Sequence, residues 1–279
     1  MKRLLLVLMM CAPAWSANVF TGDPNCIGLW TFEDDGGGEP EETDAINSIE
    51  LIPQYSQPAL DTTNYQEGSA AAYFNSSNSF QVTDAGLTSD WPIKASSTKT
   101  RTISIACWVR CTGFPANLSY HWIWGKWSTV DNKRVIGLTV YNYGSGVYKF
   151  ILWKGYNSGV SQEGKSFLPE LVINQWYHVG ITYNDVTKEV TGRVWDATAG
   201  TATDGSVTQV QSLNVEDSKW TIGAYSAGNL YQHAGQIDEV VVFNDILTSD
   251  EIDEIRLGTY GAPTGPIEGN AFMSTYNPN

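Results

Sequence analysis

Apolar and polar residues alternate along several short stretches of the chain. Between residues 102 and 110, Ile103, Ile105, Cys107 and Val109 occupy every second position, and the intervening residues fall on the other face. The same period of two returns between residues 176 and 183. Because successive side chains of a strand point to opposite faces, this pattern predicts strands with one buried face. Similar segments predict further strands at 26–33, 71–82, 121–127, 134–142, 148–154, 189–195, 218–224 and 236–243.

Short clusters of Gly, Asn, Asp and Ser separate these segments, as is typical of tight turns. They are Asp131-Asn132, Gly144-Ser145-Gly146, Asn184-Asp185 and Asp204-Gly205. No repeat of roughly 20 to 50 residues is present, and no Pro/Ser-rich linker divides the chain. Many short strands without a long helix predict an all-β fold, an antiparallel two-sheet jelly-roll sandwich. We expect it to span residues 18–260 as one domain.

One short helix is expected near the carboxyl end of this domain. Thr248 and Glu251 have the spacing of a capping box, in which both side chains bind free backbone N–H groups. Apolar residues follow at helical spacing, and Gly258 suits the C-terminal cap. Residues 261–279 contain Pro and Gly without periodicity, so we expect them to form a tail.

The first residues have the composition of a secretory signal peptide. Lys2 and Arg3 precede an apolar run over residues 4–12, and small residues follow up to Ala17. This run is far shorter than the roughly 20 residues that cross a bilayer. We therefore expect a signal peptide at 1–17, secretion to the extracellular space or cell surface, and no membrane span.

Composition and charge narrow the classes of function. The chain of 279 residues has 16 Lys and Arg against 30 Asp and Glu, which gives a net charge of −14. This balance argues against nucleic acid as a partner, because phosphate contacts need a basic face. Its 11 Trp, 14 Tyr and 9 Phe argue against a disordered chain, since these side chains build cores.

Three cysteines remain after the expected loss of the signal peptide. Cys107 and Cys111 lie four residues apart in one expected strand, which separates their Cα atoms by about 13 Å. A disulfide tolerates about 7 Å at most, so these two cannot pair with each other. Two alternatives stay open: a bridge from Cys26 to one of them, or three buried free thiols.

Several stretches, taken in order along the chain, carry a family resemblance. They are IGLWTFED at 27–34, QWYHVGITY at 175–183, WTIGA at 220–224, GQIDEVVVFN at 235–244 and LTSDEI at 247–252. In this order they resemble the laminin G-like domains of the concanavalin A-like lectin/glucanase superfamily, over about residues 26–258. The resemblance implies two packed antiparallel sheets, which agrees with the strands expected from alternation.

The resemblance also implies a structural calcium ion near the edge of a sheet. Calcium takes six to eight hard oxygen ligands, so acidic side chains from distant segments should converge. The ligands that the resemblance implies are Glu33, Asp44, Asn47 and Asp238. The alternative is that the acidic residues around the Gly-rich loop at 36–38 are merely solvated.

The same superfamily contains polysaccharide hydrolases and lyases, so enzymatic patterns need a separate search. Hydrolases of the laminarinase type place three carboxylates on one strand, spaced Glu-x-Asp-x-(x)-Glu. The segment at 251–254 lacks the third carboxylate of this pattern. The segment at 238–239 has two adjacent acidic residues, whose side chains would point to opposite faces of a strand. The lyase pattern lacks its Arg-rich strand, and His121, His178 and His233 are scattered. We therefore expect no catalytic residues.

Aromatic residues are densest between residues 120 and 127. Trp122 and Trp124 are separated by one residue, so regular alternation would place them on one face of a strand. Sugar rings stack on aromatic side chains through their apolar C–H faces, so such a strip suits a glycan. The residues predicted to bind a ligand are Trp122, Trp124, Trp127, Tyr143 and Tyr156. The alternative is that the Trp side chains pack in the core between the sheets.

These observations lead to one functional hypothesis and two rivals. The first is a secreted, non-catalytic, lectin-like module that binds a glycan or a cell-surface or matrix partner and is stabilised by calcium. The second is a structural subunit of an extracellular filament, sheath or coat, which would self-associate through the tail, a free cysteine or an exposed sheet edge. The third is a divergent polysaccharide hydrolase or lyase.

Overall fold

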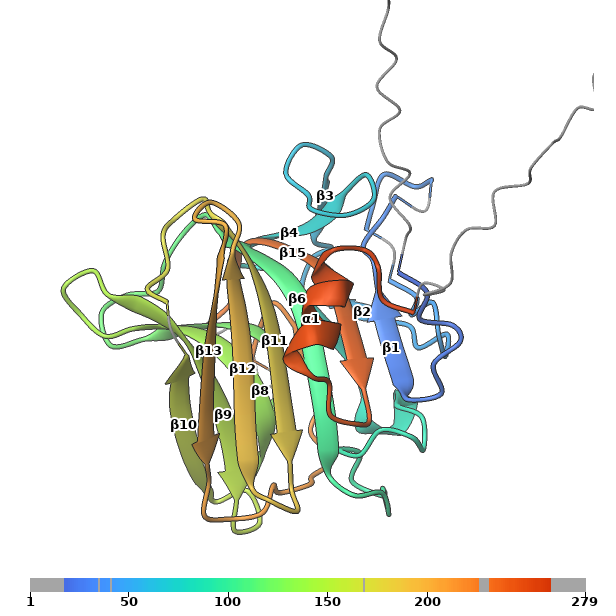
Figure 1. The fold of residues 1–279 in the computed structure, drawn as a ribbon, viewed down its shortest axis with the longest axis vertical. Helices are drawn as coiled ribbons and strands as arrows, with labels where there is room; N and C mark the ends of the chain where they lie inside the picture. The colour runs from blue at the N-terminus through green and yellow to red at the C-terminus, as the bar shows by residue number, and fades with distance from the viewer. Residues whose placement is uncertain (1–17, 35, 41, 168, 226–230, 262–279) are drawn as a thin grey trace, which may run out of the picture.

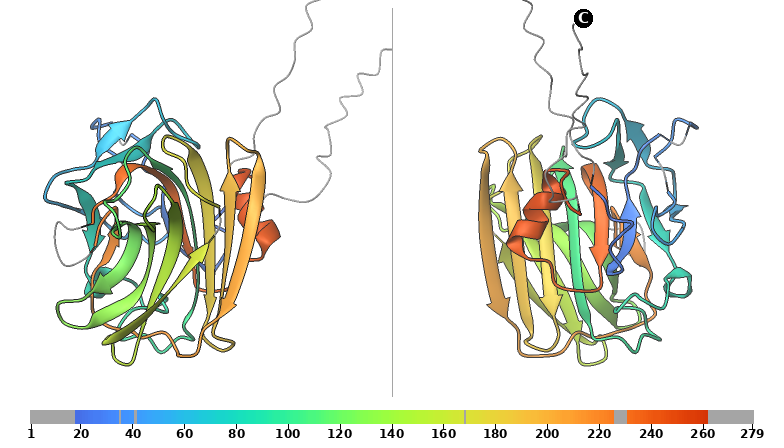
Figure 2. Two further views of the ribbon diagram at one scale, coloured as in Figure 1. Left: turned by 90° about the vertical axis from the view of Figure 1, so that its left-hand side faces the viewer. Right: turned by 45° about the vertical axis from the view of Figure 1, so that its right-hand side comes forward.

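Two antiparallel β-sheets packed face to face form the molecule (Figures 1 and 2). The computed structural model describes residues 18–261 apart from 35, 41, 168 and 226–230. One sheet has eight strands in the order β13-β12-β11-β6-β15-β4-β3, with β1 paired to β15, and the other has seven in the order β10-β9-β8-β7-β14-β5-β2. The expected all-β sandwich with one short helix is therefore confirmed.

The strands follow one another along the chain and the helix comes last. Their bounds are β1 Cys26–Trp30, β2 Ile52–Gln54, β3 Ala59–Asp61, β4 Ala71–Asn75, β5 Ser79–Val82, β6 Thr102–Cys111, β7 Tyr120–Ser128, β8 Lys133–Asn142, β9 Tyr148–Tyr156, β10 Ser161–Phe167, β11 Trp176–Asn184, β12 Glu189–Asp196, β13 Thr201–Thr208, β14 Trp220–Ile222 and β15 Ala234–Phe243. The helix α1 spans Ser249–Arg256, and a 3-10 turn covers Asp84–Gly86.

Three features of the strand pattern differ from the sequence prediction. The single strand expected at 71–82 is two strands, β4 and β5, separated by a turn. Strands β2, β3, β10 and β13 were not expected: β2 and β3 have only three residues each, and the Ser, Thr, Gln and Gly residues of β10 and β13 show no apolar alternation. The turn expected at Asp204-Gly205 is wrong: both residues lie in the middle of β13, which pairs along its whole length with β12.

The core between the sheets follows the predicted alternation of β6. Ile103, Ile105, Cys107 and Val109 all belong to it, and their neighbours on β6 face outward. Four tryptophans also line up in this core, namely Trp30, Trp91, Trp220 and Trp124, with successive ring centroids 6.2, 5.3 and 5.6 Å apart. Burying large aromatic rings supplies much of the apolar area that stabilises a sandwich.

Helix α1 covers the outer face of the eight-stranded sheet (Figures 1 and 2). Its capping box is present as predicted, with Thr248 and Glu251 each bonding the other's backbone. Ile252 and Ile255 pack onto the sheet together with Phe20, Leu247 and Tyr260. Close approach depends on Gly180 of β11, where a Cβ would lie 2.5 Å from Ile252 Cγ2.

The three described cysteines are free and buried. Cys107 and Cys111 face the core between the sheets, whereas Cys26 lies in the separate cluster beneath α1. Burial raises the pKa of each thiol to about 12, which leaves little reactive thiolate at neutral pH. The sequence left two alternatives open, a bridge from Cys26 or three buried thiols. The structure has the three buried thiols, and its described residues contain no disulfide.

Other expectations concern the chain ends and the membrane. The expected signal peptide at 1–17 and the expected tail, except Gly261, lie outside the described residues. No helix in the described part of the chain is long and apolar enough to cross a membrane.

Candidate functional site

The outer face of the seven-stranded sheet carries an aromatic surface built on β7, β8 and β9. Trp122 of β7 packs against two glycines, Gly125 of its own strand and Gly137 of the neighbouring strand β8. A Cβ at Gly137 would lie 2.2 Å from Trp122 Cζ3, and one at Gly125 would lie 2.9 Å from the same ring. These glycines therefore leave the space that the indole occupies.

Further aromatic side chains surround Trp122 and form what we call the aromatic cluster. The ring centroids of Trp127 and Tyr225 lie 5.5 and 5.8 Å from that of Trp122, and Tyr120 lies 4.4 Å from Tyr231. Such separations are those of favourable aromatic pairs. The cluster consists of Tyr120, Trp122, Trp127, Tyr141, Trp153, Tyr225 and Tyr231.

The aromatic cluster has an inner and an outer layer. Trp122, Trp127 and Tyr225 form the inner layer and are buried, with Trp122 only 2% exposed. The outer layer reaches solvent: Tyr120, Tyr141 and Trp153 are half-buried, and Tyr231 is 38% exposed. The inner rings thus fix the position of rings that a ligand can contact.

Polar groups within the cluster are only partly satisfied. Trp153 Nε1 donates to Thr139 Oγ1 at 2.9 Å, which fixes the orientation of that indole. Trp122 Nε1 and the nearby Gln232 Nε2 are buried and have no hydrogen-bond partner. Unpaired buried donors are uncommon in folded proteins, so both groups have hydrogen-bonding capacity left over.

The five residues predicted to bind a ligand do not lie together. Trp122 and Trp127 belong to the inner layer of the aromatic cluster, whereas Trp124 is fully buried in the core and stacks on Trp220. The expectation that Trp122 and Trp124 share a face is wrong, because a β-bulge between them turns both Ile123 and Trp124 toward the core.

The two predicted tyrosines lie in different places. Tyr143 is 45% exposed, its ring is 4.8 Å from that of Tyr141, and it lines a hollow with Gly144, Val147, Lys149 and Ser166. Tyr156 is half-buried and is the last residue of β9, whereas Tyr143 precedes the first residue of that strand. Tyr143 thus extends the surface of the aromatic cluster, and Tyr156 does not.

Sequence reasoning missed Tyr225 and Tyr231 as members of this surface. Neither belongs to a strand, and each reaches the cluster through a tertiary contact. Tyr225 is held by its hydroxyl, which bonds the backbone and side chain of Thr129. The carbonyl of Tyr231 accepts from Trp122 N at 2.8 Å. No local pattern marks such residues.

The predicted calcium ligands fall into two groups. Asp44 binds its own loop and β1: its carboxylate accepts from the backbone N–H of Leu29, Ile46 and Asn47 at 2.6, 2.9 and 2.7 Å. The Asn47 side chain donates to Ile27 O at 3.0 Å. This arrangement is that of an Asx-type turn, in which the carboxylate holds backbone.

Glu33 and Asp238 instead meet around the loop at residues 66–69. Asp238 Oδ2 accepts from the backbone N–H of Gln66 and Glu67 at 2.8 and 3.2 Å, and Glu33 Oε2 accepts from Ser69 N at 2.9 Å. Glu33 Oε1 and Asp238 Oδ1 are both buried and have no hydrogen-bond partner. We call Glu33, Glu67 and Asp238 the acidic cluster.

The electrostatics of the acidic cluster reflect buried, uncompensated carboxylates. Burial raises the pKa of Asp238 to about 8, two backbone N–H groups oppose the shift, and the charges of Glu33 and Glu67 add to it. Burial also raises the pKa of Glu67 to about 7, although Trp108 Nε1 donates to it at 3.4 Å. Sequence reasoning missed Glu67, which stands alone in a polar loop.

The acidic cluster fits calcium in the chemistry of its donors. Hard carboxylate oxygens without partners are what that ion binds, and a cation would neutralise the buried charge. In the described residues, however, no three His, Cys, Asp or Glu side chains are arranged to hold an ion. The structure thus brings Glu33 and Asp238 near one another but does not bring Asp44 and Asn47 into the same site.

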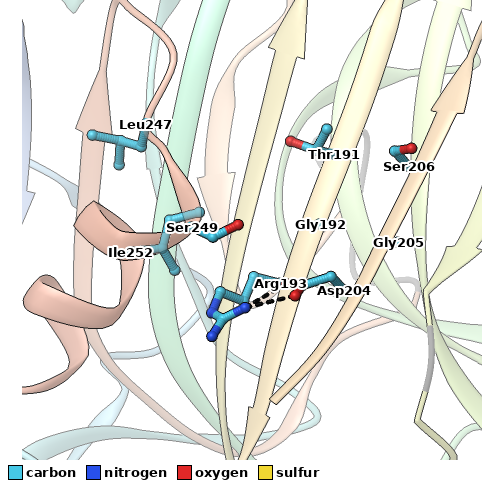
Figure 3. Close-up of a pocket in the computed structure, with 9 residues that line it drawn as sticks. All are labelled: Thr191, Gly192, Arg193, Asp204, Gly205, Ser206, Leu247, Ser249 and Ile252. Carbon is cyan, nitrogen blue, oxygen red and sulfur yellow. Dashed lines mark hydrogen bonds and ion pairs between the residues drawn. The ribbon is translucent and has the colours of Figure 1, made fainter.

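A second hollow lies on the opposite sheet, between α1 and strands β12 and β13 (Figure 3). Arg193 crosses it and is bound on both sides, by Asp204 and by Asp253, each at 2.7 Å. Its charge is therefore already paired, and no aromatic ring lines this hollow. The aromatic cluster is the stronger candidate for ligand contact.

The three histidines are buried or half-buried. His178 packs edge-on against Trp108 with ring centroids 5.0 Å apart, and burial lowers its pKa to about 3. Burial likewise lowers the pKa of His121 to about 4 and that of His233 to about 3. They act as neutral packing residues at neutral pH.

Comparison with solved structures shows the fold. Domain 4 of AbnA, a GH43 extracellular arabinanase from Geobacillus stearothermophilus, in complex with arabinotriose, is 12% identical with a TM-score of 0.57, covering 83% of this chain and 98% of that one. The binding domain of Paraclostridial Mosquitocidal Protein 1 is 11% identical with a TM-score of 0.55, covering 83% and 52%. Tailspike protein 2 of an Escherichia coli O157:H7 bacteriophage is 13% identical with a TM-score of 0.55, covering 76% and 27%.

Sequence comparison identifies the family. No curated protein matches this chain. A laminin G family model, described as the concanavalin A-like lectin/glucanases superfamily, matches residues 83–253. This range contains the strands from β6 to β15 and most of α1. The chain therefore belongs to the concanavalin A-like lectin/glucanases superfamily.

Proposed function

We propose that this protein is a secreted, non-catalytic carbohydrate-binding module whose ligand lies on the aromatic cluster. One observation carries this proposal: half-buried and exposed rings of the outer layer stand on a buried inner layer, on a sheet face without a covering helix among the described residues. Apolar faces of sugar rings stack on such side chains. Rings already held in place lose little conformational entropy when they bind.

The comparisons support a glycan as the ligand without identifying it. The AbnA domain of similar fold holds arabinotriose, which makes arabinan a sensible first probe. Lys149 is the charged residue in the hollow beside Tyr143. The outer layer itself consists of Tyr and Trp, so we expect neutral polysaccharides to bind.

Affinity electrophoresis tests this proposal. The protein would be run in native gels containing arabinan, xylan or a β-glucan, and retardation would be measured against a gel without polysaccharide. Tyr231→Ala should reduce retardation by a polysaccharide that binds, because it removes an exposed contact ring. Tyr55→Ala is the matched control, since Tyr55 is 60% exposed and lies outside the aromatic cluster. Equal retardation of both variants would exclude the cluster as the site.

We further propose that the acidic cluster binds a structural calcium ion through Glu33 and Asp238. The support is the pair of buried carboxylate oxygens that lack partners. Bound calcium would neutralise these charges and fasten the loop at 66–69 to β15. A ligand at 100 times its Kd stabilises the native state by about 2.7 kcal/mol, which for a domain of this size corresponds to roughly 5–10 °C in Tm.

Calorimetry with calcium and then with EDTA tests the metal separately from the glycan. Asp238→Asn should abolish both the heat of calcium binding and the rise in Tm. Asp44→Asn is the control: it weakens a loop, so it should lower Tm yet preserve the calcium response. If Asp238→Asn binds calcium as well as the unmodified chain does, the acidic cluster is not the metal site.

A further inference from the structure

Residues 231–234 join the aromatic cluster to the beginning of β15 and are bonded to four other parts of the chain. The partners lie in β7 and directly after β4, β6 and β14, so both sheets hold this short segment. Tyr231 belongs to the outer layer of the aromatic cluster, and its position therefore depends on these bonds. The bonds run from Trp122 N to Tyr231 O, from His233 N to Gly223 O, from Ser76 N to His233 O and from Thr112 N to Ala234 O, at 2.8, 2.8, 2.9 and 2.8 Å.

Tyr231 is held in a backbone conformation that it would not adopt freely. Its φ is 61°, in the left-handed region that residues other than glycine rarely occupy. Such a conformation persists only where the surrounding contacts impose it. Release of the segment therefore relieves strain in addition to breaking hydrogen bonds.

His233 lies within this segment and is buried without polar partners. Its side chain is 0% exposed, and its ring centroid lies 6.1 Å from that of Phe74. In the part of the chain that the structure describes, neither Nδ1 nor Nε2 has a hydrogen-bond partner. An imidazole has one donor and one acceptor when neutral and two donors when charged. Protonation in place would therefore bury a charge and two unpaired donors, which is unfavourable.

The titration of His233 reflects this burial. Burial lowers the pKa of the imidazole to about 3, from an ordinary value of 6.5, and the charge of His121 on β7 adds to this effect. The backbone of Gln236 and Arg110 acts in the opposite direction without restoring the ordinary value. His121 is half-buried, and burial lowers its own pKa to about 4. Both rings are therefore neutral at pH 7.

The other charged and titratable groups around His233 are engaged elsewhere or are uncharged at neutral pH. The side chain of Arg110 donates to Gln236 Oε1 at 2.9 Å and to Asn174 O at 3.1 Å. Asp238, the first acidic residue along β15, accepts from the backbone at residues 66 and 67. The remaining titratable side chains at this end of β4, β6 and β7, after β14 and in the segment itself are Tyr73, Cys111, Tyr120, Tyr225 and Tyr231. Among these described groups, no carboxylate compensates a charge on His233.

We propose that protonation of His233 releases residues 231–234 from their four bonding partners and removes Tyr231 from the aromatic cluster, so that the site opens in acid. Water can solvate the charged ring only when His233 leaves the core, so proton binding and opening are coupled. The consequence for binding rests on the proposed function: a carbohydrate held by the outer layer should bind more weakly in acid than at neutral pH.

Hydrogen exchange at pH 6.0, 5.5 and 5.0 tests this opening in the chain without polysaccharide. The open segment binds a proton that the closed segment does not, so its population should rise as the pH drops from 6.5 toward 3. After correction for the intrinsic exchange rate, the protection of the amides of Ser76, Trp122 and His233 should fall roughly tenfold or more between pH 6 and pH 5. Constant protection over this range would overturn the proposal.

Neutral substitutions at His233 identify the group responsible. His233→Phe and His233→Gln cannot gain a proton, so either variant that folds should lose most of the fall in protection. His178→Asn is the matched control and should keep the fall, because His178 is also buried but packs beneath α1 on the other sheet. If His178→Asn abolishes the fall, exchange occurs through unfolding of the whole domain and the proposal is wrong.

Affinity electrophoresis separates the acid release from the identity of the ligand. For a polysaccharide that retards the chain at pH 7, retardation should weaken at pH 5 in the unmodified chain and weaken less in His233→Phe. Equal weakening in both would contradict control of the site by His233. If exchange shows the opening but no polysaccharide retards the chain at either pH, the proposed function fails while the acid release of residues 231–234 stands.

Discussion

The outer faces of the two sheets are covered in different ways. On the eight-stranded sheet, α1, the segment before β1 and the segments on either side of the helix supply the covering side chains, which are Phe20, Leu247, Ile252, Ile255 and Tyr260. On the seven-stranded sheet, Trp122, Trp127 and Tyr225 cover the strands, and no helix lies over them in the described residues. The outer face of the eight-stranded sheet is covered by a helix, and that of the seven-stranded sheet is covered by aromatic side chains.

Under the proposed function, this difference separates stability from binding within one fold. On the face covered by α1, the apolar side chains pack against the helix and its flanking segments. A face closed by large rings stays dry beneath them and presents the outer rings to solvent, where they can bind without refolding. Substitutions on the two faces should therefore affect different properties.

The largest effect is expected from Trp122→Ala. Removing a buried indole leaves a cavity and should lower the free energy of unfolding by about 3–5 kcal/mol. Because the inner layer supports the outer one, retardation by a binding polysaccharide should also be lost. Urea denaturation and affinity electrophoresis measure the two effects, and a loss below 1 kcal/mol would show that the ring is not part of a packed layer.

A smaller loss of stability is expected from Ile252→Ala on the covering helix. It removes the side chain that contacts Gly180 and should lower the free energy of unfolding by about 2–3 kcal/mol. Polysaccharide retardation should stay unchanged at temperatures where the variant is folded, because α1 lies on the other sheet. Loss of retardation by this folded variant would mean that the two faces are coupled, contrary to the comparison above.

Gly137→Ala should disturb the aromatic cluster without removing any ring. The new Cβ would overlap the Trp122 ring, so the indole must shift. This shift should lower the free energy of unfolding by about 1–3 kcal/mol. Binding should weaken because the outer rings lose their support. Gly22→Ala is the control, since nothing lies within 4 Å of the position of its Cβ. Matching stabilities for the two variants would argue against the packing of the Trp122 ring on Gly137.

The smallest expected effect is on the pH dependence of stability, through His178 on the face that α1 covers. His178 packs beneath α1, and its pKa of about 3 lies below the ordinary value of 6.5, because the buried ring disfavours charge. The unfolded chain therefore binds a proton that the native chain does not, and stability falls as pH drops from 6.5 toward 3. His178→Asn should reduce this slope by about 1 kcal/mol per pH unit. Denaturation curves at pH 5, 6 and 7 measure it, and an unchanged slope would show that His178 is charged in the native state.

The sequence predicts the regular parts of this molecule better than its site. The alternation in β6 and β11 and the capping box of α1 depend on local physics, and all three are present as expected. Strand β13 was missed because its Thr and Gly residues have no apolar period, and pairing with β12 overrides the turn preference of Asp204-Gly205.

The site depends on contacts that no local spacing records. A single bulge moves Trp124 to the opposite face from Trp122, and a residue pattern does not reveal a bulge. Tyr225 and Tyr231 join the aromatic cluster from outside the strands. Asp44 resembles a metal ligand in sequence, yet its carboxylate holds three backbone N–H groups instead.

The row of four core tryptophans and the separate Trp153 give the protein two distinct optical signals. Trp124 and Trp220 stack with an interplanar angle of 25°, sealed from solvent in the main core. Neighbouring indoles held rigidly together give a strong near-ultraviolet circular dichroism signal that vanishes when packing is lost. Trp153, half-buried on the outer face, instead responds in fluorescence to whatever lies over it. One sample can thus report the integrity of its core by dichroism and the surroundings of Trp153 on the outer face by emission.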